Sequence, residues 1–147
     1  MIQIRKGTLA DEQTIAGLIS ELGEAVGALR EVNPVSWYST LRKMIASPEW
    51  TFFIAEDGKK PVGLLVLLIL PSLYYGANLA AITELIVTKE YRGKGIGKLL
   101  VEEAKNIAKK MGCAELDVSV EVQNEEAIGF YQKLGFKRKH ADFWMEI

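Results

Sequence analysis

The sequence predicts an α/β fold (α+β, with a mixed sheet) in the order β-α-α-β-β-β-α-β-α-β. Two apolar runs, Trp50–Glu56 and Val62–Leu70, are joined by a turn that contains Asp57-Gly58, a pair that favours an antiparallel hairpin. A third apolar run, Ala80–Val87, leads through a glycine-rich turn into an amphipathic helix that begins at Ile96. We therefore expect three adjacent strands and then a helix in the middle of the chain.

The N-terminal third predicts one strand and two helices. Apolar and polar residues alternate over Ile2–Ile4, as in a short strand, and apolar positions recur at helical spacing over Leu9–Val26. Asn33-Pro34 then breaks the chain, and a second helix follows over Trp37–Ile45 until Ser47-Pro48 ends it. Both helices thus precede the hairpin.

A loop is expected over Pro71–Asn78, between the hairpin and the strand Ala80–Val87. The remaining pattern predicts a helix, a strand, a helix and a last strand that closes the sheet: Ile96–Met111, Leu116–Val122, Asn124–Leu134 and Phe143–Ile147. Gly112 and Gly135 stand where glycine commonly ends a helix. At 147 residues the chain suits a single domain, residues 1–147.

Composition narrows the class of protein. A formal charge of −1 and a quarter of charged residues do not favour nucleic acid as a major partner. The longest apolar run, Val62–Leu70, lies between two prolines and is far shorter than the roughly 20 residues of a membrane helix, so no membrane partner is expected. Cys113 is alone, which excludes an internal disulfide, and no apolar signal segment follows Met1. We expect a cytoplasmic protein, and a homodimer stays open.

The glycine-rich turn predicts a site for an anion. Gly93, Gly95 and Gly97 remove every second side chain just before a helix, so backbone N–H groups and the positive end of the helix dipole can converge on a pyrophosphate. The spacing does not fit a nucleotide-triphosphatase loop, because Leu99 stands where a magnesium-binding hydroxyl belongs. A dinucleotide-binding fingerprint, Gly-x-Gly-x-x-Gly, is not matched either.

The rest of the pattern is typical of one protein family. The string Arg92-x-x-Gly95-x-Gly97, with Leu85-Ile86-Val87 upstream and Asn124…Phe130-Tyr131…Gly135-Phe136 downstream, resembles the GNAT superfamily of acyl-CoA-dependent N-acetyltransferases. The resemblance is close over Ile82–Phe136, and the order of elements expected from periodicity is that of the GNAT fold. It implies direct transfer of an acetyl group from acetyl-CoA to an amine, with no metal.

The resemblance also implies where the cofactor lies. Backbone amides of the glycine turn hold the pyrophosphate, and the pantetheine arm runs along the third central strand, where a bulge or splay would leave N–H groups free. Lysines beside the turn either add charge near the phosphates or are simply solvated. The cofactor-binding candidates are Leu85, Ile86, Val87, Arg92, Gly93, Lys94, Gly95, Ile96, Gly97, Lys98, Asn124 and Lys133.

Two residues are candidates for proton transfer. Tyr131 would protonate the leaving thiolate, and the alternative is a core tyrosine with a satisfied hydroxyl. Glu84, on the same face of its strand as Ile86, would take the proton of the amine, directly or through water, unless it pairs with a cation instead. Asn124 is both a cofactor candidate and a natural N-cap. His140 is expected to be a solvated loop residue.

Acceptor recognition is expected from aromatic residues in variable positions: Trp37, Tyr38, Tyr74, Tyr75, Phe143 and Trp144. Glu31, Glu56 or Asp142 could attract a cationic amine. A small amine such as a polyamine, an amino acid or an amino sugar is the leading acceptor. A protein N-terminus or lysine is one alternative, and a non-catalytic acyl-CoA-binding regulatory module is another.

Overall fold

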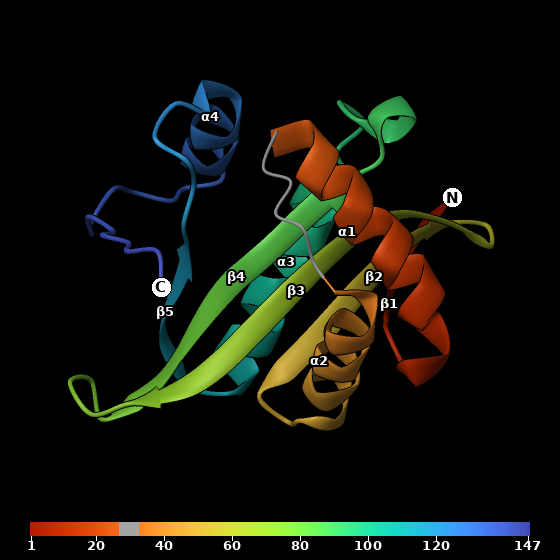
Figure 1. Ribbon diagram of the computed structural model, residues 1–147. Coiled ribbons are helices and arrows are strands. Elements are labelled where there is room, and N and C mark those ends of the chain that lie inside the picture. Colours follow the sequence, from red (N-terminus) through yellow and green to blue (C-terminus); the bar gives the residue numbers. More distant parts are fainter. Residues whose placement is uncertain (27–32) are drawn as a thin grey trace. The chain divides into compact units, whose positions relative to one another are not determined.

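The computed structural model describes residues 1–26 and 33–147, and it divides into two compact units, residues 1–117 and 118–147 (Figure 1). Each unit is described by itself. The expectation of a single domain over residues 1–147 stays a prediction. None of the helices in the described part of the chain has the length and apolar character needed to cross a membrane.

The first unit is built on a five-stranded sheet in the order β1-β2-β3-β4-β5. The strands are β1 (Ile2–Lys6), β2 (Trp50–Asp57), β3 (Lys60–Ser72), β4 (Ala77–Val87) and β5 (Cys113–Val118). Strands β1 to β4 pair as antiparallel neighbours, and β5 joins the sheet after a helical crossover. The predicted hairpin is confirmed: Asp57 pairs with Lys60 across a turn in which Gly58 has a φ of 64°.

Helices cover both faces of the sheet. The helices α1 (Glu12–Val26) and α2 (Pro34–Ala46) lie in front of the strands in Figure 1, and α3 (Ile96–Lys110) lies behind them. Two short 3-10 turns, η1 (Leu9–Asp11) and η2 (Lys89–Tyr91), lead into α1 and toward α3.

The core follows the alternation of the strands. On the face of α1 and α2, strand residues pack with helix residues in one cluster: Ile15, Leu18, Leu41, Phe52, Ile54, Leu64, Val66 and Ile86. On the other face, α3 buries an apolar stripe that includes Leu100. A Cβ added to Gly63 would lie 3.2 Å from Leu100 Cδ1, so the sheet is closely covered there.

The second unit contains α4 (Glu125–Lys133), which Asn124 caps by accepting a hydrogen bond from the N–H of Ala127 at 3.1 Å. The expected helix is thus confirmed, and so is the N-cap role of Asn124. Ser119 Oγ donates to Asp142 at 2.6 Å within the same unit.

Three expectations on secondary structure are corrected. The loop expected over Pro71–Asn78 is shortened to a turn at residues 73–76, because β3 continues to Ser72 and β4 begins at Ala77, with Pro71 paired to Asn78 near the end of the ladder. The fifth strand begins directly after Gly112 and ends at Val118, short of Val122. Apolar alternation alone did not locate these ends, because strand ends depend on which neighbour offers backbone partners.

The third correction concerns the last predicted strand. The structure assigns no strand to Phe143–Ile147, and Phe143 and Trp144 are 94% and 86% exposed. A strand needs a neighbour for its N–H and C=O groups, which the apolar pattern of a short segment does not provide. The α/β fold class with a mixed sheet is confirmed without this strand.

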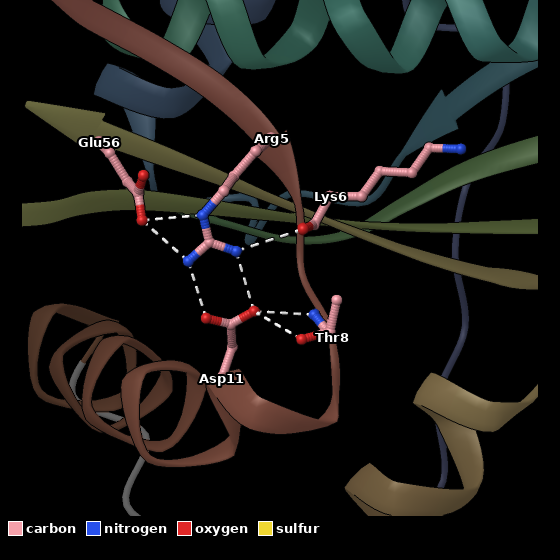
Figure 2. A network of polar contacts seen from close by, with 5 residues as sticks. All are labelled: Arg5, Lys6, Thr8, Asp11 and Glu56. Carbon is pink, nitrogen blue, oxygen red and sulfur yellow. Dashed lines mark hydrogen bonds and ion pairs between the residues drawn. The ribbon is translucent and has the colours of Figure 1, made fainter. Parts of the chain in front are cut away.

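A polar network joins β1, η1 and β2 at the start of the chain (Figure 2). The guanidinium of Arg5 donates two hydrogen bonds to Asp11, at 2.7 and 2.9 Å, and one to Glu56, at 2.8 Å. Asp11 also accepts from the N–H of Thr8 at 2.8 Å, which closes the turn before α1. The hydrogen bonds from Arg5 lower the pKa of Asp11 to about 2, against the opposing effect of burial.

Candidate active site

The turn between β4 and α3 has the geometry of an anion cradle. Gly93 and Gly95 adopt left-handed φ values of 74° and 80°, and Gly95 is the N-cap of α3. A Cβ added to either glycine would meet no heavy atom within 4 Å, so the backbone is open to an approaching group. The first helical donor is the N–H of Leu99, which bonds to the C=O of Gly95, so the amides of Ile96–Lys98 precede the helical ladder.

Arg92 lies just before this cradle and turns back toward the sheet. Its Nε donates to the C=O of Val87 at 2.9 Å, and its NH2 lies 3.9 Å from Oε1 of Glu21 on α1. The same carboxylate accepts from the N–H of Lys89 at 3.0 Å. Glu21 and Arg92 therefore tie α1 to the entry of the cradle, a link between distant parts of the chain for which the sequence carried no signal.

Lys94 lies beside a second group that sequence reasoning missed. Its Nζ is 4.9 Å from the centroid of the Tyr91 ring, a cation–π contact, and Tyr91 donates its hydroxyl to Asp57 at 2.9 Å. The hydrogen bond from Tyr91 lowers the pKa of Asp57, and Lys94 adds to this electrostatically. The hairpin turn is thus fastened to the cradle.

A β-bulge lies directly before Glu84. Val66 pairs with Glu84 and Leu67 with Ile82, which leaves Thr83 as the extra residue. A bulge or splay was expected along Leu85–Val87; in the pairing with β3 those residues are regular, and the irregularity lies directly before them, at Thr83. The side chain of Thr83 donates to the carboxylate of Glu84, an interaction between neighbours that no periodic pattern encodes.

Glu84 faces α1 and α2, as alternation along β4 predicted, and lines a cavity of about 100 Å³. The cavity walls come from α1, α2 and three strands: Ile15, Ile19, Trp37, Thr40, Leu41, Met44, Phe52 and Val66. Burial in this apolar setting raises the pKa of Glu84, and the hydrogen bond from Thr83 partly offsets the rise. Such a carboxyl can accept a proton from a group that enters the cavity.

The second unit carries the other predicted residues. Tyr131 is 8% exposed and meets the rings of Phe130 and Phe136 edge-on, at centroid distances of 4.9 and 5.3 Å. Burial raises the pKa of its hydroxyl to about 12, so the phenol stays protonated at neutral pH. This packing fits the core role, and it keeps the hydroxyl in the form that an acid requires. Lys133, in the last turn of α4, is exposed.

Cys113 and His140 do not gain a catalytic role. Burial raises the pKa of the Cys113 thiol, which opposes formation of a nucleophilic thiolate. His140 is exposed in a segment without helix or strand, as expected.

Among the acceptor candidates, Trp37 lines the cavity. Glu56 is held by Arg5 and Asp142 accepts from Ser119, and neither lines that cavity. Glu31 lies outside the described residues.

Comparisons with known proteins agree on one family. The family model described as the acetyltransferase (GNAT) family matches residues 15–136. An uncharacterised N-acetyltransferase of Methanocaldococcus jannaschii is 36% identical over 110 residues, which cover 71% of this chain and 46% of that protein. N-alpha-acetyltransferase 30 of Schizosaccharomyces pombe is 35% identical over 92 residues, or 62% of this chain and 59% of that protein. The chain thus spans about half the length of these two relatives.

A solved structure is similar over its full length. The crystal structure of a transcriptional regulator from Bacillus halodurans C-125 matches with a TM-score of 0.89 and 28% identity, and the match covers 100% of both chains. The helices and strands described above therefore occur together in an experimentally determined fold.

Proposed function

The chain belongs to the GNAT acetyltransferase family, and from this premise we propose that it transfers an acetyl group from acetyl-CoA directly to a primary amine, in the first place that of a small molecule. One observation carries the proposal. Strand β4 presents Glu84 to a cavity and then runs into the anion cradle, so a proton acceptor and a pyrophosphate site lie on one continuous stretch of chain.

The cradle fits the phosphates of acetyl-CoA. The open backbone of Gly93 and Gly95 and the amides that precede the α3 ladder can hold a pyrophosphate, while Lys98 and Lys94 add positive charge nearby. Arg92 acts here by fixing the turn, because its guanidinium is already engaged by Val87 and Glu21. When bound, acetyl-CoA supplies the acetyl group as a thioester.

We assign the proton transfers to Glu84 and Tyr131. The carboxylate of Glu84 takes a proton from the amine, directly or through water, because only a neutral nitrogen can form the new N–C bond. The hydroxyl of Tyr131 gives a proton to the sulfur as the C–S bond breaks. Starting from the ammonium form, the nitrogen loses two protons, one to Glu84 before attack and one as the amide forms; the sulfur gains one from Tyr131 and the other leaves to solvent, so the transfer balances. Leu85, Ile86 and Val87 line the pantetheine arm in this account, and Asn124 and Lys133 contact the cofactor.

The proposal is tested by mixing the protein with acetyl-CoA and a panel of primary amines and by measuring free thiol. We expect amine-dependent release of CoA that falls in the Glu84→Gln variant, while Glu24→Gln, at an exposed position of α1 that does not line the cavity, serves as a folded control. Binding of CoA without release of thiol by any amine or peptide would contradict catalysis.

Two other functions are favoured by particular observations. The likeness to an N-alpha-acetyltransferase supports a peptide N-terminus as acceptor, and a protein lysine is the related case. The likeness to a protein described as a transcriptional regulator supports a non-catalytic module that binds acyl-CoA and acts on a partner. The thiol assay separates them, because a peptide acceptor releases CoA and a regulatory module does not.

A further inference from the structure

The cavity in front of Glu84 has one ionisable group and otherwise apolar walls. Nine of the described residues line it, and eight of them are uncharged; among these eight, Thr40 has a side-chain hydroxyl and Trp37 an indole N–H. Ile15, Leu41, Phe52 and Val66 are almost completely buried around it. A ligand in this cavity therefore meets aliphatic and aromatic carbon on its sides and a single carboxyl group.

Within residues 1–26 and 33–147, no second acid lines this cavity. Glu56 belongs to the network with Arg5 and Asp11, and Glu12 pairs with Arg42 at 3.0 Å on the outer side of α2. Glu21 bonds to the turn before the cradle. A second ammonium group inside the cavity would consequently lose its hydration without gaining a partner, which is costly.

The size of the cavity limits the group that can enter. An engineered cavity of about 150 Å³ with apolar walls binds benzene. A cavity of about 100 Å³ is smaller than that and suits a chain of a few carbon atoms. Each methylene group that enters the cavity is removed from water, so such a chain can bind measurably.

We propose that the acceptor is a primary amine carried by a short apolar group, which lies between α1 and α2 while its nitrogen meets Glu84. The inference rests on the proposed transferase function and names the acceptor class of that site. It favours a monoamine, or a peptide N-terminus with an aliphatic side chain, over a polyamine or an amino sugar, because those bring further charges or hydroxyls to apolar walls.

The direct test compares two acceptors of equal length, butylamine and butane-1,4-diamine. We expect kcat/KM per amino group to be at least about tenfold higher for butylamine, since the diamine places its second charge among carbon atoms. Saturation-transfer NMR can measure the binding of each amine to the protein without acetyl-CoA. It should show tighter binding of butylamine than of the diamine. Equal or reversed preference in both measurements would overturn the inference.

A matched pair of variants checks that the cavity sets this preference. Thr40 lines the cavity and is exposed on α2, so Thr40→Glu adds a carboxylate at the rim without disturbing the core. We expect it to shift the preference toward the diamine by about three- to fivefold. Ser39→Glu adds the same charge at an exposed neighbouring position outside the cavity and should shift the preference less than twofold. Equal shifts in the two variants would locate the selectivity elsewhere and contradict the assignment.

A further assay with peptides tests whether the amine can be a peptide N-terminus. Each of its outcomes has a different meaning. Faster acetylation of a tripeptide that begins with leucine than of one that begins with lysine would extend the same chemistry to a peptide N-terminus. Release of CoA with the diamine but not with butylamine leaves the transferase function intact and overturns the acceptor class. Absence of CoA release with all amines and peptides, despite binding of CoA, overturns the proposed function itself.

Discussion

Glu84 illustrates how the surroundings of a single residue set its chemistry. A glutamate on a strand surface is an ordinary acid, but this one faces an apolar cavity and has a raised pKa. Its neighbour Thr83 is the extra residue of a β-bulge and donates a hydrogen bond to the carboxylate. Alternation along the strand predicted the face on which Glu84 lies, whereas the bulge depends on pairing with β3 and was not predictable from local sequence.

The first prediction concerns Glu84→Gln, which keeps the size of the side chain and removes the base. We expect turnover to fall by about 100-fold or more. Only the carboxylate form can act as the base, and this form is populated above the raised pKa. The loss should therefore shrink at low pH, where the parent has also lost its base, and again at high pH, where the amine is already neutral. A pH–rate profile measures this, and a profile that overlays the parent would contradict the assignment.

The second prediction concerns Tyr131→Phe, which keeps the ring contacts with Phe130 and Phe136 and deletes the hydroxyl. We expect turnover to fall by roughly 10- to 1,000-fold, with near-normal thermal stability and affinity for acetyl-CoA. Since the pKa of the hydroxyl is about 12, the parent should show no loss of this acid up to about pH 11. Parent-like turnover, with chemistry shown to limit the rate, would assign Tyr131 to packing alone.

At the scale of elements, the corner between β1 and α1 depends on charge. Asp11 is held by Arg5 in a pair of hydrogen bonds and also caps the turn that leads into α1 (Figure 2). The side chain of Asp11 is 12% exposed and that of Arg5 is 40% exposed, so water weakens the pair only in part. The network should therefore stabilise the first unit measurably.

The third prediction follows from the pKa of Asp11. Because that pKa is lowered to about 2 from 3.8, the pair adds stability above about pH 4, and this stability is lost as the pH falls toward 2. Asp11→Asn should lower the free energy of unfolding by about 1 kcal/mol at pH 7, and the difference should vanish near pH 2. Denaturant unfolding across pH measures it. Glu12→Gln, which breaks an exposed pair with Arg42, should lower the free energy of unfolding by less. Equal losses in the two variants would contradict a special stabilising role of the corner between β1 and α1.

The elements also show how far the sequence predicts structure. The hairpin around Gly58 and the helix after Gly95 were predictable, because turn chemistry and periodicity act over a few residues. The link from Glu21 to Arg92 was not, because the two side chains meet only after β4 and α1 have packed. Phe143–Ile147 was wrongly expected to be a strand for a related reason, because a strand forms only where a neighbour supplies partners for its N–H and C=O groups.

In the whole molecule, the residues with proposed chemical roles are divided between the two units. The first unit holds the cradle and Glu84, and the second holds Tyr131, Asn124 and Lys133. The motif that resembled GNAT proteins was readable from the sequence because it lies in one short segment, whereas the cavity that would select the acceptor is assembled from five separate elements.

We propose that the cradle at the start of α3 binds the pyrophosphate of CoA, and calorimetric titration of CoA against three proteins decides whether it does. In Gly95→Asp, bulk and negative charge enter the open space where the phosphates must approach, so affinity should fall at least about 100-fold while the protein stays folded. Gly76→Asp is the matched control, since Gly76 also has a left-handed φ, of 60°, and open space but lies in the turn between β3 and β4. We expect this control to bind CoA with the affinity of the parent. Equal affinity of parent and Gly95→Asp would contradict the proposal.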